Sequence, residues 1–372
     1  MEDAWEAYQN PKTAIRWDDQ LQSYTAPLTP KGQQAIAQLR LENQQYKRFD
    51  PTVLYAMYTA REALRQAGWK TDHFGINIGS SRGATQLFEQ YYDAFAKTKT
   101  AATLSSPSTT LGNISSWVAQ DLKSKGPDIS HSITCSTALH AVLNGVAWLQ
   151  SGMVDRFMVG GAEASLTPFT IAQVKAMKLT PTNETASPEF PCRALDFTKK
   201  QNTMVLGEGA GMACLESGTS KKALAYISGI GYATEKLEHA ASLSANGSCF
   251  QKSMAMALEG LDPSVVDAVI MHAPGTIKGD LSEFEAIKTF FCNKLPALTT
   301  NKWKIGHTFG ASGLLSMAMA VQFLQHQKLV STPYLERQLH PYNFANDDSE
   351  INTVLINAVG FGGNAVSILL TR

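Results

Sequence analysis

Three residues far apart in the sequence carry the side chains of nucleophilic and acid–base chemistry. Cys135 stands in Ser132–His140, between a short β-like run and a helix-like run of small apolar residues. At the amino end of a helix, backbone N–H groups and the helix dipole favour the thiolate, which makes a cysteine nucleophilic. His272 and His307 each follow a β-like run and have glycine and threonine nearby. This combination predicts covalent acyl chemistry rather than an inert buried cysteine.

The two histidines suit the stabilisation of a carbanion. Neutral imidazoles held in one tautomer can donate N–H groups to the carbonyl of a malonyl thioester, and thereby stabilise the enolate formed when carbon dioxide leaves. For each histidine alone, a satisfied core residue is the alternative. For the pair, the alternative is metal binding, which we discount because no third ligand stands at metal-ligand spacing. We therefore expect no metal here.

Two further features would support this chemistry. Lys302 precedes His307 by five residues and is either a solvated surface lysine or a buried one, paired with Glu283, that tunes the site. The turn Val359–Asn364 contains three glycines, which allow positive φ and close backbone approach, so that its N–H groups can point at an oxyanion. By itself such a cluster is only a tight turn.

The elements that must position these residues alternate between strand and helix. An apolar stripe spaced i, i+3/i+4 predicts a helix over Pro51–Ala67. The helix after Cys135 is apolar almost all round, so we expect it between two layers. Strands are expected over residues 74–79, 130–134, 156–161, 209–216, 223–231, 267–272, 297–300, 353–358 and 364–370, and further helices over 135–149, 252–258, 283–291 and 313–325. This alternation predicts an α/β fold with both sheet faces covered.

Composition excludes several classes of function. The chain has 372 residues, and its 32 Lys and Arg balance its 32 Asp and Glu, so nothing favours nucleic acid or an anionic membrane as a partner. Its five cysteines are spread out and lack C-x-x-C spacing, which predicts reduced thiols and a cytoplasmic location. Without a visible signal peptide or a membrane-length apolar stretch, we expect a soluble protein. Two long polar loops, Leu179–Pro191 and Gln338–Glu350, could cover a site.

In their order along the chain, the motifs resemble those of the β-ketoacyl-(acyl carrier protein) synthases, in the two-histidine (Cys-His-His) class of the thiolase superfamily. The matching segments are Gly126-Pro127, Thr134–Ser136, Gly160–Ala164, Gly207–Gly211, His272–Glu283, Lys302–Thr308 and Gly360–Asn364. The resemblance implies a thiolase-like fold, with two similar α/β halves in a layered α-β-α-β-α arrangement. Residues 1–218 would form the half with the cysteine, and residues 219–372 the half with both histidines and the Gly-rich turn.

The same resemblance implies roles for individual residues. Cys135 would accept the acyl group, while His272 and His307 would promote decarboxylation and stabilise the enolate, supported by Lys302 and Glu283. The backbone N–H groups of Cys135 and Phe361 would form the oxyanion hole. The residues expected to contact substrate are Thr276, Thr308, Phe361 and Met204.

The implied reaction is a decarboxylative Claisen condensation of an acyl thioester with malonyl-acyl carrier protein, which gives 3-ketoacyl-acyl carrier protein in fatty acid, polyketide or polyene synthesis. The substrates would be carried on the phosphopantetheine of the carrier protein, with no separate cofactor. The enzyme would form a homodimer, or a heterodimer with a related chain-length-factor subunit. Two alternatives remain open: a non-condensing partner subunit, and an enzyme of the same fold that only transfers acyl groups.

The chain departs from the family pattern at three places. Pro274 replaces a threonine that would contact the phosphopantetheine arm, although Thr276 remains. Met204 replaces an aromatic residue, and the stretch Arg193–Gly207 around it is slightly longer than usual, so the acyl pocket is expected to differ. The opening strand of the family is missing, which predicts either a trimmed N-terminus or an N-terminal sheet with an unusual number of strands.

Overall fold

The structure is a computed structural model that describes residues 2–111, 113–182, 187–237, 243–292, 294–336, 342 and 350–372. Its α-helices are α1 (Glu2–Gln9), α2 (Pro30–Glu42), α3 (Pro51–Ala67), α4 (Thr85–Thr98), α5 (Ser105–Thr109), α6 (Asn113–Leu122), α7 (Thr137–Gln150), α8 (Pro168–Ala176), α9 (Ser248–Ala257), α10 (Ile277–Phe291), α11 (Lys302–Ile305) and α12 (Ser312–His326). The short 3-10 helices are η1 (Tyr46–Arg48), η2 (Pro263–Val265) and η3 (Phe309–Ala311).

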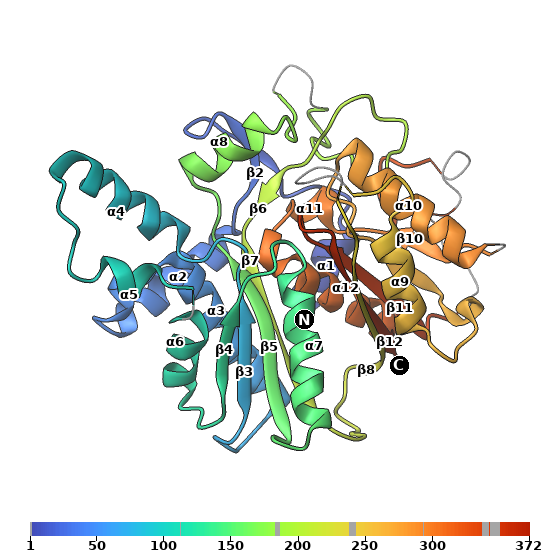
Figure 1. The fold of residues 1–372 in the computed structure, drawn as a ribbon, viewed down its shortest axis with the longest axis horizontal. Helices are drawn as coiled ribbons and strands as arrows, with labels where there is room; N and C mark the ends of the chain where they lie inside the picture. Colours follow the sequence, from blue (N-terminus) through green and yellow to red (C-terminus); the bar gives the residue numbers. More distant parts are fainter. Residues whose placement is uncertain are drawn as a thin grey trace.

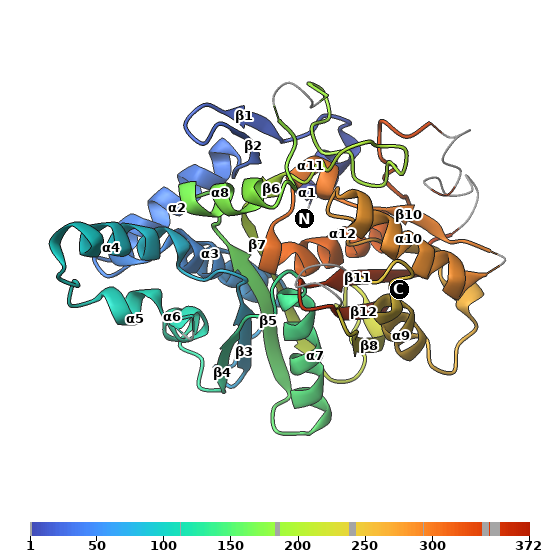
Figure 2. The ribbon, with the colours of Figure 1, turned by 45° about the horizontal axis from the view of Figure 1, so that its top comes forward.

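The strands are β1 (Arg16–Asp18), β2 (Ser23–Ala26), β3 (Gly75–Gly79), β4 (Asp128–His131), β5 (Arg156–Glu163), β6 (Leu206–Gly207), β7 (Gly209–Glu216), β8 (Tyr226–Thr234), β9 (Ala268–Ile270), β10 (Ala297–Thr299), β11 (Thr353–Val359) and β12 (Asn364–Thr371). Within the described ranges, a sheet in the first half has four strands in the order β4-β3-β5-β7, and one in the second half has five in the order β10-β9-β11-β12-β8. A small third sheet, β1-β2-β6, lies at the side of the first two in Figure 2.

The two large sheets share one topology. In the first half β3 pairs in parallel with β4 and β5, and β5 pairs antiparallel with β7. In the second half β9 pairs in parallel with β10 and β11, and β11 pairs antiparallel with β12. The second sheet then adds β8 beyond β12, whereas no strand of the described chain pairs with β7 on its outer side. The first sheet thus has one strand fewer.

Helices fill the space between the sheets and cover their outer faces (Figure 1). Helix α7 packs on β3 and β5, helix α12 packs on β7 and β11, and the two helices contact each other, so they form the central layer. Helices α3 and α6 cover the first sheet, and α9 and α10 cover the second. This is the predicted layered α-β-α-β-α arrangement of two similar halves, and α7 is buried between layers as expected.

Local signals set the ends of several helices. Asp50 caps α3 by accepting a hydrogen bond from the N–H of Thr52, Pro51 occupies the first turn, and Gly68 ends the helix with φ 65°. These are the residues that favour a helix start and stop at such positions. The prediction of a helix over Pro51–Ala67 is confirmed.

Other boundaries differ from the sequence prediction. The strand expected over residues 130–134 spans Asp128–His131, and the helix expected from Cys135 begins at Thr137. Thr134 has φ 47°, a left-handed conformation that neither a strand nor a helix accommodates, so a turn separates the two elements. The helix expected from Glu283 begins at Ile277, because Thr276 provides its N-cap.

Several elements were not predicted at all. The region before Pro51, for which the sequence predicts no strand, contains the β1–β2 hairpin. Helices α4 and α5 form an arm that extends away from the sheets in Figures 1 and 2. Of the two loops expected to cover a site, residues 183–186 of the first and most of Gln338–Glu350 lie outside the described residues. In the described chain, no helix combines the length and the apolar character needed to span a membrane.

Candidate active site

Cys135 lies in the turn between β4 and α7, and only 3% of its surface is exposed. The turn is fixed by the hydroxyl of Thr137, which accepts a hydrogen bond from the N–H of Ile133 at 2.9 Å. Around the thiol is a buried apolar cluster drawn from α8, the segment around β6, and η3. Its other members are Ile171, Val174, Met204, Leu206 and Phe309.

Burial governs the acidity of this thiol. It raises the pKa of Cys135 to about 12; the charge of Glu163 acts in the same direction, while Lys302 and Arg82 lower the pKa. The expectation of a resting thiolate is therefore wrong, because loss of water around the charged form outweighs the favourable field at the helix end. Nucleophilic attack by this sulfur would therefore require a base that accepts the thiol proton.

The two histidines lie together although 35 positions separate them in the sequence. Their ring centres are 5.1 Å apart and the rings are perpendicular. His272 follows β9, and His307 is held by backbone hydrogen bonds from its N–H to Val205 O at 2.7 Å and from Gly207 N to its own carbonyl at 3.1 Å. The His307 ring also contacts Phe309, with ring centres 5.3 Å apart. Because Phe309 packs in the apolar cluster of Cys135, the structure brings thiol and imidazoles to one place.

Both imidazoles are neutral at physiological pH. Burial, together with the charge of Lys302, lowers the pKa of His272 to about 3. Burial and the same charge, with that of His272, lower the pKa of His307 well below its ordinary value. Among the described residues, the few buried polar side-chain atoms without a hydrogen-bond partner include His272 Nδ1, His307 Nδ1 and Thr308 Oγ1. Such unsatisfied groups are costly in a folded core, and their gathering here fits a site that a polar substrate completes.

Lys302 and Glu283 are both buried beside the histidines, but they do not form the expected direct pair. Lys302 Nζ donates to Asn301 Oδ1 at 3.1 Å, and no ion pair of the described chain joins it to Glu283. Burial lowers the pKa of Lys302 to about 8, and the charge of Glu283 opposes this shift. The two groups thus interact only through their fields.

Glu283 serves instead as an anchor for the loop of His272. Its carboxylate accepts hydrogen bonds from His272 N at 3.0 Å, from Ala273 N at 2.9 Å and from Asn357 Nδ2 at 3.2 Å. Glu283 lies in the second turn of α10, next to the loop that precedes this helix. Backbone N–H groups of that loop therefore donate to its carboxylate, and Lys302 Nζ does not. Burial raises the pKa of Glu283 to about 7.

The Gly-rich turn approaches the nucleophile as expected. The N–H of Phe361, expected in the oxyanion hole, donates to Thr134 Oγ1 at 3.1 Å. A Cβ added at Gly360 would lie 2.0 Å from the same hydroxyl, so only glycine allows this approach. Ser136 Oγ donates to Asn364 Oδ1 at 3.2 Å, which ties the turn to the start of α7. In this structure the Phe361 N–H is therefore paired with the Thr134 hydroxyl.

The remaining candidate substrate contacts fall into two groups. Met204 is buried in the cluster around the thiol, and Thr308 is buried next to His307. Thr276 Oγ1 accepts a hydrogen bond from Gly279 N at 3.2 Å and so caps α10, while Phe361 is half-buried. Thr276 therefore has a structural task in addition to any contact with substrate.

Sequence reasoning missed Glu163, which is fully buried at the end of β5. It accepts hydrogen bonds from Ser81 N at 2.8 Å, Arg82 N at 3.1 Å, Ser80 Oγ at 3.0 Å and Gly310 N at 2.9 Å. Burial raises its pKa to about 7. The signal was present, since this glutamate stands inside the quoted segment Gly160–Ala164, but nothing in the sequence indicates its distant donors.

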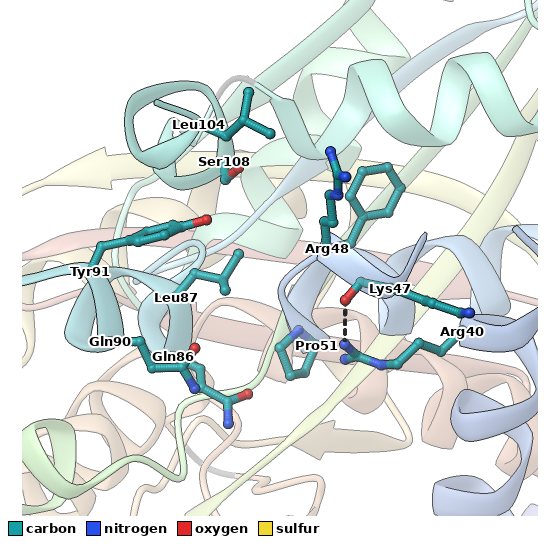
Figure 3. Close-up of a pocket in the computed structure, with 11 residues that line it drawn as sticks. Arg40, Lys47, Arg48, Pro51, Gln86, Leu87, Gln90, Tyr91, Leu104 and Ser108 are labelled. Carbon is teal, nitrogen blue, oxygen red and sulfur yellow. Dashed lines mark hydrogen bonds between the residues drawn. The ribbon is translucent and has the colours of Figure 1, made fainter. Parts of the chain in front are cut away.

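A separate cavity of about 410 Å³ lies outside this site, between η1, the start of α3 and the α4–α5 arm (Figure 3). Arg40, Lys47 and Arg48 line one side, and Arg40 Nη1 donates to Lys47 O at 3.3 Å. Tyr91 and Leu104 stand on the other side. No carboxylate is among its described lining residues, so the cavity attracts anions. In the described part of the chain, no group of three or more His, Cys, Asp or Glu residues could hold a metal ion.

Comparison with known proteins agrees with this geometry. The family model of the β-ketoacyl synthase N-terminal domain matches residues 5–221, and that of the C-terminal domain matches residues 224–336. The chain belongs to the β-ketoacyl synthase family, whose members are acyltransferases that form carbon–carbon bonds.

Individual relatives are distant but cover most of the chain. The 3-oxoacyl-[acyl-carrier-protein] synthase 2 of Staphylococcus aureus is 28% identical over 349 residues, which cover 88% of this chain and 86% of that protein. A β-ketoacyl synthase from Burkholderia phymatum has a similar fold, with a TM-score of 0.87 at 22% identity, covering 100% of this chain and 95% of the other. The ketosynthase in a complex with its type II polyketide synthase acyl-carrier protein gives a TM-score of 0.85 at 18% identity, with the same coverage.

Proposed function

We propose that this protein condenses an acyl group held on Cys135 with a malonyl group held on an acyl carrier protein. In the first step Cys135 Sγ attacks the carbonyl of an acyl thioester. The bond between the carbonyl carbon and the carrier sulfur breaks, and a neutral imidazole passes the thiol proton to the leaving sulfur. The backbone N–H groups of Cys135 and Phe361 bind the oxyanion, which requires Phe361 N–H to leave the Thr134 hydroxyl.

In the second step the histidines act on the malonyl thioester. Its carbon–carboxylate bond breaks, carbon dioxide leaves, and the electron pair forms an enolate whose oxygen accepts N–H hydrogen bonds from His272 and His307. The enolate carbon then attacks the acyl carbonyl on Cys135, a carbon–carbon bond forms, and the sulfur leaves and regains a proton. The products are 3-ketoacyl carrier protein, carbon dioxide and free thiol, so one proton is taken up per turnover.

One observation carries this proposal: of two perpendicular, neutral imidazoles with unpaired Nδ1 atoms, that of His307 contacts Phe309, which packs in the buried cluster around the thiol of Cys135. Neutrality matters because an imidazolium would give up its proton to the enolate instead of stabilising it by a hydrogen bond. Lys302 supports neutrality, since its positive charge lowers the pKa of both histidines. A buried cysteine with a purely structural role would need no such neighbours.

The carrier protein is the natural partner for the basic cavity of Figure 3. Its phosphopantetheine arm has a phosphate, and Arg40, Lys47 and Arg48 offer three positive charges. The cavity wall includes α4, which directly follows the loop Ser80–Gly83 next to the active site. Beyond this arm the reaction needs no cofactor.

The proposal extends to the two halves of the chain, to a dimer and to a cytoplasmic location. The halves are residues 1–218 and 219–372, each built around one of the two large sheets. The half-exposed β4 lies at the open edge of the first sheet, immediately before the nucleophile, and supports a dimer with a second copy or with a related chain-length-factor subunit. The protein would work in the cytoplasm, in fatty acid, polyketide or polyene synthesis.

Mass spectrometry of the intact protein and its peptides tests the reaction. The protein is incubated with acyl carrier protein bearing an acyl group, and malonyl carrier protein is then added, with Cys135→Ala as the control. We expect an acyl adduct on Cys135 that disappears on malonyl addition while 3-ketoacyl carrier protein forms. An adduct that persists or is only hydrolysed would indicate acyl transfer without condensation. Absence of any adduct would indicate a non-condensing partner subunit.

A further inference from the structure

Arg82 places a positive charge at the margin of the apolar cluster around Cys135. Its loop, Ser80–Gly83, follows β3, and Ser81 O accepts a hydrogen bond at 3.1 Å from Ser132 Oγ, three residues before the nucleophile. The guanidinium carbon lies 5.8 Å from the ring centre of Phe309. Phe309 belongs to the cluster that contains the thiol. The guanidinium therefore borders the apolar cluster that contains the thiol.

A second polar side chain holds Arg82 in this position. Arg82 Nη2 donates a hydrogen bond to Gln173 Oε1 on α8. Gln173 stands between Ile171 and Val174, which are both buried members of the cluster. The Arg82–Gln173 pair thus joins the loop after β3 to α8 and borders the cluster where α8 and η3 meet.

These neighbours would treat different acyl groups unequally. The end of a long saturated chain that reaches the pair would strip water from a guanidinium and an amide without offering a hydrogen bond, which is unfavourable. An oxygen on the acyl group could instead accept a hydrogen bond from a charged donor, which is worth more than a neutral one. The pair would therefore reject long alkyl ends and retain groups with an acceptor oxygen.

We propose that Arg82 and Gln173 determine acyl specificity, by selecting acyl groups with a keto or hydroxyl oxygen over saturated chains of the same length. This inference rests on the proposed function, because it takes Cys135 as the point of acyl attachment. It also requires the loop after β3 to have two tasks. Its backbone N–H groups bind Glu163, while the side chain of Arg82 faces the acyl group.

Loading of Cys135 with matched acyl groups tests the inference. Carrier protein with acetoacetyl, butyryl or octanoyl groups is offered, and the rate of adduct formation is measured by mass spectrometry. Acetoacetyl and butyryl have four carbons each and differ in one oxygen. In the wild type we expect acetoacetyl to load about 10-fold faster than butyryl, the effect of one charged hydrogen bond, and octanoyl to load slowest.

Variants separate the contribution of charge from that of size. Arg82→Met should reduce the acetoacetyl preference to within about 3-fold of butyryl and speed octanoyl loading, since methionine fills similar space without charge. Gln173→Met should speed octanoyl loading but keep the acetoacetyl preference, as Arg82 remains. Arg82→Lys should keep part of the acetoacetyl preference. It is the control for folding, because it retains the positive charge at this position. Arg65→Met, an exposed arginine of α3, is the matched control and should leave all ratios unchanged.

The outcomes distinguish the inference from the proposed function. If the wild type forms no adduct with any acyl group, the proposed function fails. If it forms adducts but does not prefer acetoacetyl over butyryl, the inference is overturned while the function stands. The same holds if Arg82→Met keeps the wild-type ratio of acetoacetyl to butyryl loading. Should Arg82→Met not fold, the inference is overturned if Gln173→Met loads octanoyl no faster than the wild type.

Discussion

Glu163 in the first half and Glu283 in the second are both buried, and burial raises the pKa of each to about 7. Each holds a loop of the active site through backbone N–H groups. Their donors differ: those of Glu283 come from the second half only, whereas Glu163 binds Ser81 N in the first half and Gly310 N in the second. Glu163 therefore joins backbone segments of both halves, whereas Glu283 holds groups within the second half.

The sheets of the two halves differ in a related way. Strand β12 has partners on both sides, β11 and β8, and its residues Ala365–Leu370 are buried. Strand β7 pairs only with β5 among the described strands, and its residues Met212–Leu215 are half-buried. Edge strands have backbone groups that no strand satisfies. Among the described strands, the sheet that contains β7 is therefore less completely enclosed than the sheet that contains β12.

The largest effect should follow removal of the nucleophile. Cys135→Ala should abolish acyl loading and reduce condensation by about 10³-fold or more, because residues that act as a unit lose nearly all activity when one is removed. The measurement is 3-ketoacyl carrier protein formed per minute. If Cys135→Ala kept more than a tenth of the wild-type condensation rate, the proposed role of Cys135 as nucleophile would be contradicted.

The two glutamates should give different losses. Glu163→Gln should lower both acyl loading and condensation by about 10²-fold, since small misplacement between loops costs that much. Glu283→Gln should lower condensation to a similar degree but leave acyl loading within about 3-fold of the wild type. Parallel assays of the two steps check this. If both variants lost acyl loading and condensation to the same degree, the two glutamates would have the same task.

The pH dependence of stability should reveal the neutral histidine. The pKa of His272 is about 3 in the folded protein and 6.5 ordinarily. Its contribution to the free energy of unfolding is therefore fully present above pH 6.5 and is lost as the pH falls toward 3. Between pH 7 and pH 5 the wild type should lose about 2 kcal/mol more unfolding free energy than His272→Asn. Glu163 and Glu283, with raised pKa values, act in the opposite direction but equally in both proteins. Denaturant titrations in which the unfolding free energies of the wild type and His272→Asn change equally with pH would refute this.

The smallest effect concerns the two sheets. Amide hydrogens of β7 should exchange with solvent about 10-fold faster than those of β12, because an edge strand opens more easily than an enclosed one. Hydrogen exchange followed by mass spectrometry of the two segments gives the comparison. Slower exchange in β7 would show that another chain covers this edge in solution.

Much of the fold was predictable because its signals are local. The caps Asp50 and Gly68 specify α3, and the alternation of strands and helices specifies the layers. The strands β1, β2 and β6, with the sequences Arg-Trp-Asp, Ser-Tyr-Thr-Ala and Leu-Gly, escaped prediction because they lack the apolar run that marks the equally short β9, Ala-Val-Ile.

In the site, residue type revealed the thiol and the histidines, but not what surrounds them. Glu163 and Arg82 act through partners 81 to 147 positions away, such as Gly310 and Gln173, which only the folded chain brings close. The prediction of a direct Lys302–Glu283 pair was wrong because the sequence does not show that backbone N–H groups donate to the Glu283 carboxylate. The acidity of Cys135 was misjudged because helix position is visible in the sequence and burial is not.

We predict that acyl loading depends on the thiol of Cys135, whereas decarboxylation depends on the imidazole of His272. The most direct test compares Cys135→Ala with His272→Ala, using malonyl carrier protein labelled in the free carboxylate and an acyl carrier substrate. We expect Cys135→Ala to release labelled carbon dioxide without forming an adduct, and His272→Ala to form the adduct but release little carbon dioxide. Release of carbon dioxide by His272→Ala at the wild-type rate, or its loss in a folded Cys135→Ala protein, would contradict this division.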